Sequence, residues 1–180
     1  MTEGALSRRY GKAFFQLAEE EKREDAVGQE IEQFVNAYTS SALQTVLNNP
    51  AFDAERRKKI LLEVAKALQL SSLSVHFLSI LLERDRLNYL PSIGVYYRRL
   101  LNEKRGRVEA KVVSARDLDE AALTRLREAL HGISGKEVIL HQETNPELIG
   151  GLLVELEGKI YDGSVRTQLE NMKQRIMRPY

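Results

Sequence analysis

The stretch NPELIGGLLVELEGKIYDGSVRTQLENMK, residues 145–173, contains four glycines within fourteen positions. Such a density of glycine is typical either of a loop that binds phosphate or of tight turns between strands. A phosphate loop requires a strand, a glycine-rich turn and then a helix whose first amides face the anion. Here the pair Gly150–Gly151 precedes the strand-like Leu-Leu-Val-Glu-Leu, and Lys159 is followed by Ile160 instead of the Ser or Thr of a Walker motif. The pattern therefore favours turns over a phosphate site.

Each glycine then has a role in the predicted backbone. Gly150–Gly151 permits a tight entry into a strand, and Gly158 supplies the positive φ of a hairpin turn. Gly163 leads into a terminal helix, for which Ser164 is the predicted N-cap. The apolar residues of this helix recur at helical spacing and form one stripe: Val165, Leu169, Met172 and Ile176.

The segment before this stretch predicts two further strands around a helix. The first strand is indicated by apolar residues that alternate with charged ones: Val108, Ala110 and Val112. An amphipathic helix follows and ends near Gly132, and either of two acids can cap it: Asp117 or Asp119. Residues 136–144 predict the second strand. Residues 106–180 are therefore expected to form a small α+β domain in the order strand, helix, strand, strand, short strand, helix.

Residues 5–105 show helical periodicity throughout and no strand pattern. The predicted breaks are marked by Asp53 as an N-cap, by Ser71 or Ser72 as another, and by Pro91 in a first turn. The fold class predicted for the whole chain is α+β, with a bundle of about six helices in residues 1–105 before the small α+β domain. The first and fifth helices carry more apolar residues than one buried stripe requires: Leu6, Tyr10, Ala13, Phe14, Phe15 and Leu17, and then nearly every residue from Val75 to Leu82.

Composition limits the classes of function. The 27 Lys and Arg nearly balance the 26 Asp and Glu, whereas a surface for nucleic acid normally carries a basic excess. There is no cysteine, so the chain has neither disulfides nor a thiolate zinc site. No apolar run approaches the roughly 18 residues that cross a bilayer, and the start, MTEGALSRRY, does not resemble a secretory signal. The expected protein is soluble and cytoplasmic.

No pattern of catalytic or metal-binding residues emerges. The three histidines fall in three separate predicted elements, without the spacing of a metal site: His76, His131 and His141. Ser164, His141 and Asp162 could be combined into a hydrolytic triad, but no nucleophile elbow is present. In the basic cluster YYRRLLNEKRGR, residues 96–107, the tyrosines join the predicted inner face of a helix while the bases point outward. We therefore expect no catalytic residue, no metal and no cofactor.

Several stretches together resemble the delta subunit of the bacterial ATP synthase, the family that includes the mitochondrial oligomycin-sensitivity-conferring protein. SRRYGKAFFQLAEE (7–20) is similar to the family's first helix, and FLSILLERDRLNYLPSI (77–93) to its central helix and the corner after it. EKRGRVEAKVVSA (103–115) resembles the bridge into the second domain. NPELIGGLLVELEGKIYDGSVRTQL (145–169) resembles the family signature, although Asn145 stands where the family usually has Asp. The resemblance extends over essentially the whole chain.

The resemblance implies a non-catalytic stator subunit of a rotary proton-translocating ATP synthase, peripheral to the cytoplasmic face of the bacterial cell membrane. It implies that the bundle binds the N-terminal helices of alpha subunits with its first and fifth helices. The candidate residues for that contact are Tyr10, Ala13, Phe14, Leu17, Phe77, Leu78 and Leu81. The α+β domain would face the b subunits of the peripheral stalk, partly through the stripe Val165, Leu169, Met172 and Ile176. An RNA- or ribosome-associated helical adaptor is the alternative, and the near-zero net charge disfavours it.

Overall fold

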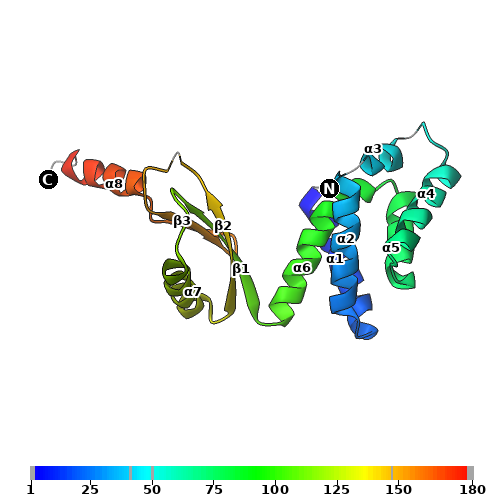
Figure 1. The fold of residues 1–180 in the computed structure, drawn as a ribbon, viewed down its shortest axis with the longest axis horizontal. Coiled ribbons are helices and arrows are strands. Elements are labelled where there is room, and N and C mark those ends of the chain that lie inside the picture. The colour runs from blue at the N-terminus through cyan, green and yellow to red at the C-terminus, as the bar shows by residue number, and fades with distance from the viewer. Residues whose placement is uncertain (1–2, 41, 50, 147, 178–180) are drawn as a thin grey trace. The chain divides into compact units, whose positions relative to one another are not determined.

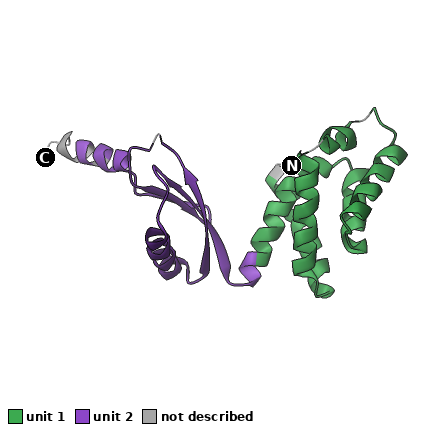
Figure 2. Ribbon diagram, in the orientation of Figure 1, with its two compact units in different colours: residues 1–101 green, residues 102–180 purple. Residues whose placement is uncertain are grey.

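The computed structural model describes residues 3–40, 42–49, 51–146 and 148–177. The chain forms two compact units, residues 1–101 and residues 102–180 (Figure 2). The division falls inside the last helix of the bundle, whereas the sequence pattern places the domain boundary after residue 105, about one turn further on. Each unit is described below by itself.

The N-terminal unit is built from helices alone (Figure 1). The bundle of six helices predicted from periodicity is confirmed within the described residues, and a short 3-10 helix, η1, precedes the last of them. The helices are α1 (Glu3–Glu20), α2 (Glu24–Ser40), α3 (Leu43–Asn48), α4 (Ala54–Ala67), α5 (Ser72–Glu83), η1 (Leu87–Tyr89) and α6 (Leu90–Lys104).

Aromatic side chains hold the centre of this bundle. The ring of Phe14 in α1 lies parallel to that of Phe77 in α5, with 3.8 Å between the ring centroids. Tyr97 of α6 lies against Phe14 with its ring tilted and 5.7 Å away. Phe34 and Tyr38 of α2 are fully buried in the same core. Burial of each such side chain stabilises the fold by about 1.5–3 kcal/mol, so this cluster ties four of the helices together.

Gly11 allows α1 and α6 to approach each other closely. A Cβ atom at Gly11 would lie 2.8 Å from Cδ1 of Tyr96, closer than two carbons can pack. The glycine therefore serves helix packing, because a side chain at this position would force the Tyr96 ring or the helices to shift.

The helix ends agree with the sequence in part. Ser71 accepts a hydrogen bond from the amide of Ser74 and caps α5, as predicted. Asp53 precedes α4 as expected, but its side chain makes no capping hydrogen bond. The helix expected to stop near Gly132 continues to Ser134 and ends at Gly135, because Gly135 takes the left-handed conformation (φ 67°) that closes a helix.

The C-terminal unit is a four-stranded mixed sheet with one helix on a face and one at the end of the chain. Its elements are β1 (Arg107–Ser114), α7 (Glu120–Ser134), β2 (Glu137–Thr144), β3 (Leu152–Leu156), β4 (Lys159–Asp162) and α8 (Val165–Met177). This is the predicted order. The strands lie in the order β2-β1-β3-β4, with β1 parallel to β2 through the α7 crossover and antiparallel to β3.

Helix α7 covers one face of the sheet. Leu126 and Leu130 of α7 pack against alternate residues of the strands, including Val108, Val112 and Val154. The β3–β4 hairpin turns at Glu157 and Gly158, both with positive φ, as the predicted two-residue turn requires. The structure therefore confirms the predicted strand β1, the β3–β4 hairpin and the positive φ of Gly158.

Candidate protein-binding surfaces

The seven residues predicted to bind an alpha subunit divide into core and surface. Four of them are buried in the bundle core: Phe14 (1% exposed), Phe77 (8%), Leu78 (3%) and Leu81 (0%). Ala13 and Leu17 are exposed, with 48% of Leu17 accessible, and Tyr10 is half-buried. We call Tyr10, Ala13, Leu17 and the edge of Phe77 the α1–α5 face.

The apolar residues of α1 beyond one buried stripe are partly buried in the bundle and partly exposed. Phe15 is buried against Tyr97 of α6, with an edge-to-face geometry and 5.3 Å between ring centroids. Phe15 is therefore part of the bundle core, and its apolar surface needs no partner to cover it. The flank with Ala13 and Leu17 is left exposed by the described residues of the unit.

Arg86, just before η1, holds Tyr10 in place. Its Nη1 donates a hydrogen bond of 2.5 Å to the Tyr10 hydroxyl, and its guanidinium carbon lies 5.6 Å from the ring centroid. Together with the stacking of Phe14 on Phe77, this contact places the N-terminal half of α1 beside the C-terminal end of α5. The two helices therefore run antiparallel along the α1–α5 face.

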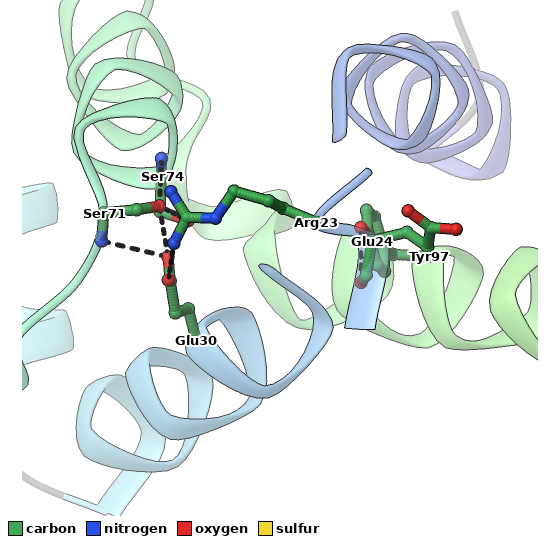
Figure 3. A network of polar contacts seen from close by, with 6 residues as sticks. All are labelled: Arg23, Glu24, Glu30, Ser71, Ser74 and Tyr97. Atoms are coloured by element: carbon green, nitrogen blue, oxygen red, sulfur yellow. Dashed lines mark hydrogen bonds and ion pairs between the residues drawn. The ribbon is translucent and has the colours of Figure 1, made fainter. Parts of the chain in front are cut away.

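Glu30 of α2 fixes the other end of α5 (Figure 3). Its Oε2 accepts hydrogen bonds from the amide of Ser71 at 3.1 Å, the Ser71 hydroxyl at 2.6 Å and the Ser74 hydroxyl at 2.5 Å. Its Oε1 lies 3.6 Å from Nη2 of Arg23. A carboxylate at a helix N-terminus also interacts favourably with the helix dipole. Glu30 thereby positions the helix that carries Phe77.

Replacing Glu30 with alanine is expected to lower the free energy of unfolding of the N-terminal unit by about 2 kcal/mol. The buried Ser74 hydroxyl would lose its acceptor, and the start of α5 would lose its anchor to α2. Urea unfolding followed by circular dichroism measures the change. Glu32→Ala is the matched control on the same helix, because Glu32 pairs with Arg98 at the surface, and its loss should cost under about 0.5 kcal/mol. Equal losses for the two variants would contradict the anchoring role of Glu30.

The second predicted surface lies on α8, which extends from the end of β4 away from the sheet (Figure 1). Leu169 is 56% exposed and Met172 is 60% exposed, while Val165 is half-buried at the start of the helix. The side chain of Ile176 lies outside the described residues. The α8 face, Leu169 and Met172, is thus an apolar helical stripe that the described part of the unit leaves open.

A polar turn sets the start of α8. Ser164 accepts a hydrogen bond from the amide of Thr167 at 3.3 Å, which confirms Ser164 as the N-cap. Asp162 accepts from the amide of Ser164 and from the hydroxyl of Thr167, each at 2.8 Å. These bonds, led by the Ser164 amide, hold the pKa of Asp162 below its ordinary value. The stabilisation is therefore present above the ordinary pKa and is lost as the pH falls through the lowered one.

The triad that could be drawn from the sequence does not exist. His141 lies on β2, at one edge of the sheet, while Asp162 ends β4 at the opposite edge. The Ser164 hydroxyl interacts with Thr167 instead of a base. Among the described residues, no three His, Cys, Asp or Glu side chains gather into a possible metal site.

Tyr97 of the basic cluster is not available to stack on bases. Tyr97 is 1% exposed and donates a hydrogen bond of 2.9 Å to the carbonyl of Glu24 (Figure 3). Burial raises the pKa of Tyr97 well above its usual range, and nearby acids add to the shift.

In the part of the chain that the structure describes, no helix is both long and apolar enough to cross a membrane.

Sequence reasoning missed Glu30 and Arg86. The contact between Glu30 and Ser71 joins residues 41 positions apart, and that between Arg86 and Tyr10 joins residues 76 apart. No local pattern identifies such pairs, because both are charged residues in helices or turns where a solvated side chain is the usual outcome.

The sequence matches the family described as ATP synthase delta (OSCP) subunit over residues 6–176. A protein of Anaeromyxobacter sp. (strain Fw109-5) named ATP synthase subunit delta is 37% identical, and the match covers 98% of this chain and 99% of that protein. The ATP synthase subunit delta of Geobacter metallireducens is also 37% identical, with 96% and 97% covered. A chain of the Toxoplasma gondii mitochondrial ATP synthase hexamer has a similar fold, with a TM-score of 0.79, 18% identity and 100% of both chains covered. These matches give no support to an RNA- or ribosome-associated adaptor. The chain belongs to the ATP synthase delta (OSCP) subunit family.

Proposed function

We propose that this chain is a stator subunit of a rotary ATP synthase, which joins the catalytic head to the peripheral stalk and resists the torque of the rotor. One observation carries the proposal: two separate compact units each expose an apolar face on a helix. A stator joint has to hold two partners at once, and one binding face per unit suits that task. The role is structural, and the chemistry of ATP synthesis belongs to other subunits.

On the head side, the α1–α5 face binds the N-terminal helix of an alpha subunit. Ala13 and Leu17 make the contact, with the edges of Tyr10 and Phe77 beside them. The buried residues Phe14, Leu78 and Leu81 form the floor beneath this face and do not touch the partner. An amphipathic helix bound in this way would place its own apolar residues at positions i, i+3, i+4 and i+7 over the face.

On the stalk side, the α8 face binds the end of the b subunits. Leu169 and Met172 are more than half exposed and lie one turn apart, as in a helix that packs against another helix. The flanking bases Arg166 and Lys173 suit an acidic partner. Through these two contacts the chain is held at the cytoplasmic face of the bacterial membrane, as a peripheral part of the complex.

Two surface variants, one single and one double, separate the two binding functions. Leu17→Asp is expected to weaken binding of a synthetic alpha N-terminal peptide at least tenfold, about 1.4 kcal/mol, and to leave b-subunit binding unchanged. The double variant Leu169→Asp, Met172→Asp should do the reverse. The matched controls are Leu62→Asp on α4 and Ile133→Asp on α7, whose side chains are 42% and 58% exposed and lie outside both faces. Titration calorimetry with the full chain measures each affinity.

A folded variant that lost both partners together would contradict the division of labour between the units. A wild-type chain that bound neither partner would overturn the proposed function. Saturable binding of RNA that falls steeply with added salt would favour the adaptor instead.

A further inference from the structure

The sequence Glu83-Arg84-Asp85-Arg86 alternates acids and bases at the end of α5. In the structure the acids and the bases have different surroundings. Both acids form ion pairs with α4: Glu83 with Lys58 and Asp85 with Arg57, each at 3.0 Å. Neither arginine has an ion-pair partner among the described residues. The charges of Arg84 and Arg86 are therefore not neutralised by these acids, and they lie on the side of α5 that faces α1.

These arginines belong to one end of the α1–α5 face. Arg84 lies two helical turns after Phe77, on the same side of α5, and Arg86 contacts Tyr10. Arg9 directly precedes Tyr10 on α1, one turn before the exposed Ala13, and forms no ion pair among the residues described. Helical spacing thus places Arg9 and Arg84 at the same end of the face as Arg86, beside the N-terminal half of α1 and the C-terminal end of α5.

The opposite end of the face is acidic. Glu20 lies one turn after Leu17, and both Glu20 and Glu21 are exposed, with no ion pair in the described part of the chain. Lys22 follows in the turn after α1. The next base, Arg23, faces Glu30. Because α1 and α5 run antiparallel, this acidic end lies beside the start of α5.

We infer that the α1–α5 face selects an amphipathic helix with opposite charges at its two ends. Acidic side chains of that helix lie over Arg9 and Arg84, and basic ones lie over Glu20 and Glu21. Arg9 and Glu20 are eleven positions apart, which is about 16 Å along the helix, so the partner's acids and bases are separated by about three turns. The inference rests on the proposed function, because it specifies the chemistry and direction of the helix bound at that same face.

Charge complementarity of this kind sets orientation and partner choice more than affinity. The apolar contacts of Ala13 and Leu17 would hold a bound helix in either direction, because apolar contacts alone do not distinguish the two orientations. The charged ends remove this ambiguity, because a helix lying the wrong way round would place acids on Glu20 and bases on Arg84. A joint that transmits torque requires such a defined geometry.

A charge-swap experiment with the full chain tests the inference. The probe is a labelled synthetic peptide of about the first 25 residues of the cognate alpha subunit, long enough to span α1. The variants are Arg84→Glu, Glu20→Lys and their combination. Arg8→Glu is the matched control, because Arg8 lies on the far side of α1, about 140° and 180° around the helix from Ala13 and Leu17. A second peptide carries the same residues with every acid and base exchanged.

We expect each single variant to weaken binding of the natural peptide three- to tenfold, the combination to weaken it further, and the control to have no effect. The exchanged peptide should bind the wild-type chain poorly and the combined variant well. Rescue of this kind cannot result from a loss of folding. If the exchanged peptide binds the wild-type chain as tightly as the natural one, the charge selection is overturned, even though loss of binding in Leu17→Asp would leave the proposed function intact. If Leu17→Asp also has no effect, the site itself is overturned.

Discussion

Replacing Phe14 with alanine is expected to lower the free energy of unfolding of the N-terminal unit by about 4 kcal/mol. The ring is 1% exposed, stacks on Phe77 at 3.8 Å and touches Tyr97, so its removal leaves a cavity between three helices. The cavity adds to the lost transfer free energy, because the surrounding helices relax only in part. Hydrogen exchange of the full chain, read by mass spectrometry, should show faster exchange in residues 3–101 and little change in the C-terminal unit.

Leu17→Ala is the matched control, since Leu17 lies one turn further along the same helix and is 48% exposed. It should cost under about 1 kcal/mol while weakening binding of the alpha peptide. The opposite outcome, a stable Phe14→Ala chain that fails to bind, would show that Phe14 contacts the partner directly.

Replacing Gly151 with alanine is expected to destabilise the C-terminal unit by about 3 kcal/mol. Gly151 has a φ of 83°, and a Cβ atom there would lie 2.3 Å from the carbonyl oxygen of Gly163 and 2.9 Å from Cα of Ser164. The clash cannot relax easily, because hydrogen bonds on both sides of Gly151 hold the two segments together. The Gly163 amide bonds to the Leu152 carbonyl at 2.8 Å, and the Val165 amide bonds to the Gly150 carbonyl at 3.0 Å.

The control for Gly151 is Gly132→Ala in α7, where no atom beyond the neighbouring residues and the helix's own backbone lies within 4 Å of the added Cβ. Alanine in a helix is favoured over glycine by about 1 kcal/mol, so this variant should raise the stability of the same unit. Thermal unfolding of the full chain, with hydrogen exchange to assign the unit, measures both changes. Wild-type stability in Gly151→Ala would mean that the turn before β3 can adopt another conformation. Such a result would contradict the backbone role of this glycine.

Gly151→Ala should also show how the stability of the C-terminal unit affects binding to the b subunits. Gly151 and Gly163 together aim α8 from the end of the sheet, since the start of that helix is bonded to the turn at Gly150. A distorted turn would move the α8 face, so Gly151→Ala should weaken binding to the b subunits and leave the alpha peptide unaffected. We therefore expect the glycines of the stretch 145–173 to act on function through the backbone.

The amino-acid sequence by itself determined the elements, their order and the family. Helical and strand periodicity, the caps at Ser71 and Ser164 and the hairpin at Gly158 depend on residues a few positions apart, which a sequence displays directly. The same local signals were ambiguous where two residues of one type compete. Gly132 and Gly135 both stand near the end of α7, and in the structure Gly135 takes the left-handed conformation that closes the helix.

The tertiary structure alone decided which apolar residues are exposed on the surface. Phe14, Phe15 and Leu17 belong to one helix and look alike in the sequence, but Phe77 covers the first, Tyr97 covers the second and no described residue fully covers the third. The tertiary structure also decided that Glu83 and Asp85 form ion pairs with α4, while Arg84 and Arg86 form none with any described residue. The physical reason is the same in both cases: burial and ion pairing depend on side chains from distant parts of the chain, and helical periodicity specifies only the face on which a residue lies.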